Sequence, residues 1–291
     1  MRHLEITPVA PFEFERSLDF LGRFEPTAGE QVIRDGSVWK AFRTGGQTVG
    51  MRVRSTGTPE EPRLLVKTTG PVETDKAASL FVRRWLSTDD DLTGFYRIAD
   101  EDRDMAPVVE RLRGLHQVRF PSPFENAAWA VLAQRIPMKV ARRMKQALVE
   151  RYGDRVEMDG RELWAFPEPS DMAGASEAEI QPLLNNERRS RAVAAVAQAF
   201  NEVDEQWLRT APILEVEQWL LAIHGIGTWS AAFVLFRGLG RIERMPITKM
   251  MLGAARDVYG PTMTQEEAER LAERYGEWQG YWTMYAMVGS P

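Results

Sequence analysis

The stretch 223-IHGIGTWSAAFVLFRGLGRIERMPITKM-250 is the most informative part of this chain, because its first two glycines separate a helical segment that precedes them from a second one that follows. Apolar residues at helical spacing from Leu214 to Ile223 predict a first amphipathic helix, which the sequence GIG at 225–227 interrupts. Two glycines around one apolar residue allow a tight turn with positive φ. Because Ile226 can fill the core between the flanking helices, the stretch predicts a helical hairpin.

The second helix of this hairpin is expected from Trp229 to Arg237, with Thr228 as its cap and Gly238 at its end. Amides of the turn and of the first helical turn have no partner within the helix. They point outward, and the helix dipole adds to their attraction for an anion, so the hairpin can hold a phosphate. Any helical hairpin can turn on Gly-x-Gly, so the turn alone does not identify a function.

Composition places the chain among soluble globular proteins, with 44% hydrophobic and 27% charged residues over 291 positions. No apolar run approaches the length of a membrane span, and the first residues lack the layout of a signal peptide. The absence of cysteine excludes disulfides and zinc–thiolate sites, and three scattered histidines make a metal site unexpected. We therefore expect a cytoplasmic protein, associated with the nucleoid, that has no membrane partner.

The net charge of −5 conceals a segregation of basic residues. Residues 111–156 carry ten arginines and lysines, and residues 237–256 carry five against the single acid Glu243. Phosphate binding depends on local potential rather than total charge. Charge runs are also typical of solvated helix faces, so the segregation permits nucleic-acid binding without requiring it.

Residues 1–110 show strand and turn signals and predict a small α+β domain. Asp35-Gly36 and Gly45-Gly46 are dipeptides typical of hairpin turns. A helix is expected from Thr74, with Trp85 on its apolar face. Three segments read as strands of an antiparallel sheet: VWKAFR at 38–43, VGMRVR at 49–54 and RLLVKTT at 63–69.

Residues 111–291 show helical signals almost throughout. Ser122 and Thr264 each begin a capping box, and a helix that starts at Pro137 is expected to stop at Gly153. Further helices are expected over 187–201 and in a terminal aromatic segment, WQGYWTMYAMV. The chain is thus predicted to be an α+β protein whose second part is helical.

The sequence resembles the helix–hairpin–helix (HhH-GPD) DNA glycosylases, and within them the AlkA-like enzymes that act on alkylated bases. The resemblance rests on GIGTWSA at 225–231 and its distance to Pro246, on residues 116–153 around Gln134, and on FPEP at 166–169. It implies a small N-terminal antiparallel-sheet domain followed by two all-helical lobes around a cleft. Such proteins bend duplex DNA, insert a wedge side chain and flip a damaged base into an aromatic pocket, where a carboxylate assists base release.

The resemblance also implies roles for individual residues. The wedge position is Arg135, whose flat guanidinium can fill a gap in a base stack or can instead pair with phosphate. The residues implied in DNA binding are Gly225, Ile226, Gly227, Thr228, Arg135, Lys139 and Arg244. Those implied in the base pocket are Trp229, Phe233, Gln134, Trp282 and Tyr285, although ordinary core packing is the commoner role of apolar pairs such as Trp229 and Phe233.

One departure from the family pattern concerns the catalytic acid. Lys249 occupies the place where the family has an aspartate, and no Asp or Glu lies between Glu243 and Asp257. The sugar becomes positive as the base leaves, so a carboxylate lowers the barrier and an ammonium raises it. Three interpretations stay open. The first is a DNA-binding protein that has lost excision, and the second is excision by another route, in which alkylated bases leave readily without the acid or Glu243 folds back to replace it. The third is Lys249 as a Schiff-base nucleophile.

A second departure lies in LLNNERRSRAV at 183–193, where the family has a leucine–glycine turn before a basic helix. Asn185-Asn186 can adopt left-handed conformations, so a second anion-binding turn is possible there. We expect double-stranded DNA, damaged or bent, as the partner of a monomeric protein. No cofactor or metal is expected, although the resemblance implies that a monovalent cation can bind at the hairpin carbonyls.

Overall fold

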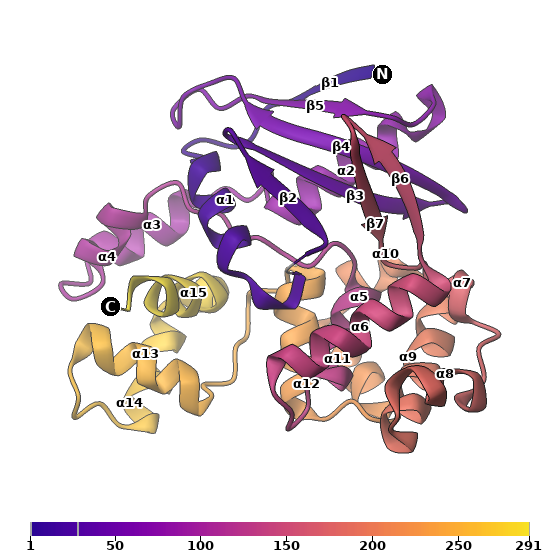
Figure 1. The fold of residues 1–291 in the computed structure, drawn as a ribbon. Helices are drawn as coiled ribbons and strands as arrows, with labels where there is room; N and C mark the ends of the chain where they lie inside the picture. Colours follow the sequence, from indigo (N-terminus) through magenta and orange to yellow (C-terminus); the bar gives the residue numbers. More distant parts are fainter. Residues whose placement is uncertain (1, 28, 291) are drawn as a thin grey trace.

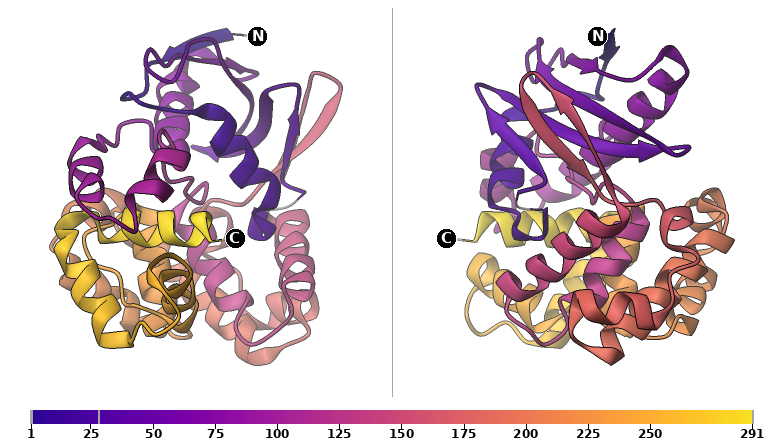
Figure 2. Two further views of the ribbon diagram at one scale, coloured as in Figure 1. Left: turned by 90° about the vertical axis from the view of Figure 1, so that its left-hand side faces the viewer. Right: turned by 45° about the vertical axis from the view of Figure 1, so that its right-hand side comes forward.

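The computed structural model describes residues 2–27 and 29–290, which form an antiparallel sheet packed on a body of helices (Figures 1 and 2). The sheet has the strand order β1-β5-β4-β3-β2, and every neighbouring pair in it is antiparallel. Its strands are β1 (Arg2–Ile6), β2 (Gln31–Arg34), β3 (Ser37–Thr44), β4 (Gln47–Ser55) and β5 (Leu64–Thr68). The three predicted strands are confirmed as β3, β4 and β5, whereas β1 and β2 were not anticipated.

One face of the sheet is covered by helices α1 (Phe14–Arg23) and α2 (Asp75–Leu86), which follow short 3-10 turns or loops. Alternate strand residues such as Val38, Val53 and Val66 point into this core, where they meet Leu18 and Trp85. Since the side-chain period of a strand is two, the residues between them point to the opposite face of the sheet.

That opposite face is partly covered by a strand pair from the second half of the chain, β6 (Asp154–Met158) and β7 (Arg161–Ala165). The expectation of two all-helical lobes is therefore corrected here. Trp39 and Ala41 of β3 pack against Met158 and Leu163 of this hairpin. The hairpin approaches so closely that a Cβ at Gly50 would lie 3.1 Å from a methyl of Val156.

The remaining elements are helical. Helices α5 (Pro123–Leu132), α6 (Met138–Tyr152), α9 (Glu187–Glu202) and α14 (Gln265–Arg274) match the predicted segments, and Ser122 and Thr264 accept the capping hydrogen bonds expected of them. The others are α3 (Thr93–Asp100), α4 (Ala106–Leu112), α7 (Pro169–Met172), α8 (Glu177–Leu184), α10 (Glu205–Thr210), α11 (Ile213–Ala222), α12 (Thr228–Phe233), the π-helical turn η3 (Val234–Leu239), α13 (Lys249–Tyr259) and α15 (Gln279–Gly289), with 3-10 turns η1 (Glu25–Thr27), η2 (Val72–Thr74) and η4 (Gly276–Trp278).

The hydrophobic cores divide the chain differently from the expected boundary at residue 110. Helices α3 and α4 pack with the C-terminal helices, because Phe95 lies against the rings of Tyr275, Tyr281 and Tyr285. A separate core joins α5, α6, α8, α9, α11 and α12. No helix within the described ranges is long and apolar enough to cross a membrane.

Candidate nucleic-acid interface

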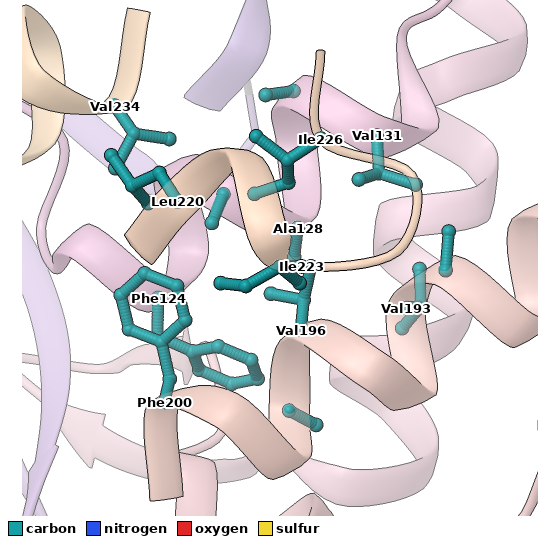
Figure 3. Packing of buried hydrophobic residues seen from close by; sticks show 14 of the residues in the cluster. Phe124, Ala128, Val131, Val193, Val196, Phe200, Leu220, Ile223, Ile226 and Val234 are labelled. Atoms are coloured by element: carbon teal, nitrogen blue, oxygen red, sulfur yellow. The ribbon is translucent and has the colours of Figure 1, made fainter. Parts of the chain in front are cut away.

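The predicted hairpin is present between α11 and α12. Gly225 adopts φ +93°, and a Cβ at this position would lie 2.4 Å from the Cβ of Ala192 on α9. Both the backbone conformation and the space therefore require glycine. Ile226 is buried beside Val131 and Ile223, as Figure 3 shows, which confirms that it fills the core beneath the turn.

The start of the second helix differs from the prediction. Gly227 is the N-cap, with φ −101° and no side-chain cap, and Thr228 is the first helical residue rather than the cap. A Cβ at Gly227 would meet no atom within 4 Å. The amides of the first turn of α12 therefore face an open space, which is what an approaching phosphate requires.

The second helix also runs further than predicted, through η3 to Leu239, and ends at Gly240 with φ +72°. Its wide π turn leaves carbonyls for partners outside the helix. The side chain of Gln117 donates to the Phe236 carbonyl at 3.0 Å, and the Phe120 amide donates to the Arg237 carbonyl at 2.7 Å. The helix is thereby fixed to the segment that leads from the sheet domain into α5.

A groove of about 930 Å³ surrounds the open end of α12. Three segments far apart in the sequence form it: the loop after α5, the start of α9 and the hairpin itself. No Asp or Glu stands among its described lining residues, which are Val131, Ala133, Gln134, Arg135, Asn186, Arg188, Arg189, Ala192, Gly225, Ile226, Gly227, Thr228, Trp229 and Ser230. The groove thus combines outward-facing amides with three arginines.

Gln134 holds the loop after α5 against the hairpin. Its side-chain amide donates to the Gly225 carbonyl at 2.8 Å and lies 3.3 Å from Ser230 Oγ. Arg189 supports the same loop by donating to the carbonyls of Leu132 and Gln134 at 3.2 and 2.5 Å. Gln134 therefore lines the groove in a positioning role, and its predicted contact with a base stays a prediction.

Arg135 is exposed at the rim of the groove and has φ +54°. A left-handed backbone is unfavourable for an arginine and costs on the order of 1 kcal/mol. The conformation turns the loop outward at the position where the family resemblance implies a wedge. Lys139, on the first turn of α6, is also exposed but does not line the groove.

Trp229 lines the groove and stacks on Phe233, which is not among the lining residues; the ring centroids lie 5.0 Å apart and the planes are at 13°. Trp229 is 47% exposed, which is unusual for so large an apolar side chain, whereas Phe233 also packs edge-on against Phe120. Core packing therefore accounts for Phe233 but leaves one aromatic surface of Trp229 available to a ligand.

Arg237 is a buried cation that the sequence reasoning did not single out. Its guanidinium lies 4.7 Å from the ring of Phe20 and 4.8 Å from that of Phe24, and its Nη2 has no hydrogen-bond partner within the described structure. Burial, helped by the nearby charge of Arg119, lowers the pKa of Arg237 to about 9. The only sequence signal was an arginine inside the apolar run VLFRGL.

Lys249 is the first residue of α13, directly after Thr248, whose side chain accepts the capping bond from the Met251 amide. It is exposed and does not line the hairpin groove. Glu243, the acid considered as a substitute, is paired with Arg241 at 2.6 Å. No carboxylate is thus brought to the groove from this segment.

Three further predicted residues are not brought to the groove. Trp282 and Tyr285 are fully buried in the C-terminal core, where Trp282 donates to Tyr259 and Tyr285 donates to the carbonyls of Leu112 and Leu115. Arg244 lines a different hollow, beside α11 and α14. Their predicted contacts with DNA stay predictions that this arrangement does not favour.

The turn before α9 has the conformation expected of its asparagines. Asn185 is left-handed, with φ +48°, and Asn186 caps α9 by accepting from the Arg189 amide at 3.0 Å. Because this cap already occupies the helix end, the exposed Arg188 is the main anion-binding group that α9 offers to the groove.

No family model matches the sequence, but individual proteins do. A DNA-3-methyladenine glycosylase of Bacillus subtilis is 28% identical over 222 residues, which cover 74% of this chain and 73% of that protein. A probable bifunctional transcriptional activator/DNA repair enzyme AlkA of Mycobacterium tuberculosis is 27% identical over 284 residues, or 95% of this chain and 54% of the relative. The chain therefore spans about half of that second protein.

Solved structures share the fold across nearly the whole chain. The 3-methyladenine DNA-glycosylase from Archaeoglobus fulgidus matches with a TM-score of 0.81 and 22% identity, covering 99% of this chain and 98% of that one. The 8-oxoguanine glycosylase/lyase of Clostridium acetobutylicum in complex with double-stranded DNA matches with a TM-score of 0.71 and 15% identity, covering 99% and 96%. The hairpin, the fold and the sequence relatives agree, and together they support the resemblance of this chain to the AlkA-like proteins of the helix–hairpin–helix DNA glycosylase superfamily.

Proposed function

We propose that this protein acts as a monomer in DNA repair, binds damaged or bent duplex DNA through the hairpin groove, and has lost or greatly slowed base release. The observation that carries the proposal is the lining of the groove, in which open helix amides and three arginines meet no described carboxylate. Such a surface attracts phosphates but offers no negative group to a sugar that becomes positive.

Binding through the hairpin is supported by its geometry. The uncapped amides after Gly227 and the exposed side chains of Arg135 and Arg188 border the same groove. Amides at a helix start and arginine side chains are both common contacts of backbone phosphate. The likeness to a glycosylase solved with double-stranded DNA supports the same partner for this chain.

The loss of base release is supported by Lys249. Removing one well-placed electrostatic group typically slows a reaction by about 100- to 1000-fold, and reversing its sign is expected to be worse. A cation in the first turn of α13 also stands at the unfavourable end of the helix dipole. Phosphate affinity is a physical reason for a lysine at this position.

The second candidate function is base release without the acid. The exposed, stacked ring of Trp229 favours it, because an aromatic surface beside the hairpin is suited to a flipped base. Alkylated purines are cationic and leave readily, so flipping and stacking can suffice. A Schiff base at Lys249 is less supported, because the side chain is exposed, whereas nucleophilic lysines are typically activated by desolvation or a neighbouring cation.

The experiment that tests DNA binding compares the native protein with Thr228→Glu in a duplex-binding assay at several salt concentrations. A carboxylate at the first position of α12 favours the helix but repels phosphate. We expect at least a tenfold loss of affinity for lesion-containing duplex without a loss of thermal stability. Equal affinities for the two proteins would overturn the hairpin as the binding site.

A further inference from the structure

A second basic surface lies on the outer face of the sheet, at the end of the molecule away from the hairpin (Figure 1). Lys67 of β5 stands directly opposite Arg52 of β4 on one side and His3 of β1 on the other. Arg54, two residues along β4, points to the same face. We call this surface, lined by His3, Arg52, Arg54, Leu65 and Lys67, the basic sheet face.

The cations of the basic sheet face are incompletely neutralised. Like charges directly opposite each other on antiparallel strands are destabilising, so the Arg52–Lys67 pair opposes folding unless an anion compensates it. Lys67 pairs with Asp159 at 2.7 Å, whereas Arg52 and Arg54 form no ion pair with any described residue. Asp159 also lies near enough to interact with the charge of Arg52, and Glu5, further along β1, points to the same face.

Arg52 is held in place by neutral groups. Its guanidinium lies 4.7 Å from the ring of Trp39 and donates to Ser37 Oγ at 3.2 and 3.0 Å. The guanidinium of Arg161 also lies over Trp39, at 4.5 Å. These contacts fix the position of Arg52 without cancelling its charge, which is the arrangement of a cation prepared for an outside anion.

The surface is open as well as charged. Helices α1 and α2 cover the other face of the sheet, and the β6–β7 hairpin covers β3 and the part of β4 around Gly50. A hollow of about 290 Å³ remains over β4, β5 and β1. In a chain with a net charge of −5, such a local excess of cations fits a polyanion.

We propose that the basic sheet face binds the backbone phosphates of a second DNA segment while the hairpin groove holds the first. Charge complementarity indicates a polyanion as the partner. The choice of DNA rests on the proposed function, in which the hairpin at the other end of the molecule binds DNA. The α11–α12 hairpin and the strands of the basic sheet face lie at opposite ends of the molecule (Figure 1), so we expect the two surfaces together to link two duplex segments.

The test uses an undamaged duplex and the Thr228→Glu protein, in which the hairpin is blocked. We expect weak residual binding that falls as salt rises. Adding Arg52→Gln and Arg54→Gln is expected to reduce the slope of log affinity against log salt by about 2, since each lost phosphate contact removes nearly one unit. Gln at position 52 can still donate to Ser37, which preserves the local structure.

The matched control adds Arg103→Gln and Arg274→Gln, two exposed cations outside the sheet domain. This control removes the same two positive charges as the sheet variant does, and it is expected to leave the slope of log affinity against log salt unchanged. Equal slopes for the control and the sheet variant, or no residual binding at low salt, would overturn the proposal. Binding of poly-glutamate but not of duplex at this face would overturn the assignment to nucleic acid.

A second readout separates this proposal from the proposed function. Native protein is expected to bring a donor-labelled and an acceptor-labelled duplex together. The sheet variant, which in this experiment carries Arg52→Gln and Arg54→Gln with an intact hairpin, is expected to bind one duplex but not to join two. If the hairpin did not bind DNA, Thr228→Glu would leave affinity unchanged while the sheet variant still reduced it. Joining of duplexes that persists in the sheet variant contradicts the proposal.

Discussion

Lys249 is a residue whose local surroundings favour the opposite charge. It stands at the first position of α13, where the helix dipole stabilises acids by roughly 0.3–1 kcal/mol. Lys249→Asp is therefore expected to raise the free energy of unfolding by about 1 kcal/mol and the Tm by roughly 2–4 °C, measured by thermal denaturation. Lys249→Gln is the control and should give about half of this increase in the free energy of unfolding. A lower Tm for Lys249→Asp than for the native protein would show that Lys249 has a stabilising partner.

Arg135 combines an unfavourable backbone with an exposed position at the groove. In Arg135→Gly, relief of the left-handed strain opposes the greater entropy of the unfolded chain, so stability is expected to change by less than about 1 kcal/mol. Affinity for a lesion-containing duplex should fall at least tenfold in a titration. Unchanged affinity would remove Arg135 from the interface.

At the residue scale, sequence patterns located the hairpin residues well and the buried residues poorly. Gly225 and Ile226 have the predicted roles because their requirements, positive φ and a core position, are local. The placement of Arg237 beside Phe20 and Phe24 depends on chain segments more than 200 residues apart, and Trp282 is buried in a core that also includes residues of α3 and α4. No local pattern carries such information.

The two glycines of the hairpin element have different physical requirements. Gly225→Ala places a Cβ 2.4 Å from Ala192 and imposes a strained φ, so it is expected to lower stability by about 2 kcal/mol or more. Gly227→Ala meets no atom within 4 Å and should leave stability within about 1 kcal/mol. Its methyl faces the open amides, however, and is expected to weaken duplex binding at least tenfold.

Urea denaturation and duplex titration of the two variants check this contrast. The Gly227→Ala protein serves as the folded control for the Gly225→Ala protein. If both variants lost stability equally, the hairpin would not have the conformation described here. If Gly227→Ala bound DNA normally, the open end of α12 would not be a phosphate site.

At the element scale, strands with alternating patterns and helices with capping boxes were predictable. The β6–β7 hairpin was not, because residues 154–165 follow a helix and pair only with each other. Its apolar residues make sense once Trp39 and Ala41 of the distant strand β3 are seen to cover them. The π turn η3 was also unpredictable, since Gln117 and Phe120 from another segment take its carbonyls.

The whole molecule is joined by a buried charge cluster between the sheet domain and the helical body. Lys145 of α6 contacts both Glu125 of α5 and Glu30, each at 2.6 Å, and Lys40 of β3 contacts Glu30 at 3.1 Å. All four side chains are at most 8% exposed. Burial alone would raise the pKa of Glu30, but the two ammonium groups overcome it and lower that pKa to about 2.

This cluster predicts an acid limb, by which we mean a fall in the free energy of unfolding as the pH decreases. The folded-state pKa of Glu30 lies below its ordinary value of 4.5, so its contribution is complete above about pH 4.5 and is lost as the pH falls toward 2. Burial raises the pKa of Glu125, which therefore does not contribute to this limb. Urea denaturation as a function of pH is expected to show stability falling across this window.

Glu30→Gln is the variant that isolates the effect. It leaves two buried ammonium groups with one carboxylate and is expected to lower stability by about 3–5 kcal/mol at neutral pH. Its stability should also depend less on pH between 4.5 and 2. A variant with the same acid limb as the native protein would show that other carboxylates cause it.

The division of the whole molecule was the least predictable feature. Turn signals before residue 110 and helical signals after it suggested a boundary there, yet α3 and α4 pack with α15 and the C-terminal core. The change from strand signals to helix signals along the sequence does not coincide with the boundary between two hydrophobic cores. The family resemblance was needed to expect a cleft, and the position of the groove depended on three separated segments.

Whether the protein has lost base release is tested by single-turnover assays with duplexes that contain an alkylated or a deaminated base. The native protein, Lys249→Asp and Lys249→Gln are compared after each is shown to bind the duplex. We expect release near background for the native protein and at least about 100-fold faster release for Lys249→Asp. The loss of base release would be contradicted if the native protein released the base well above background, at a rate similar to that of Lys249→Asp. Borohydride trapping would then show whether Lys249 forms a Schiff base.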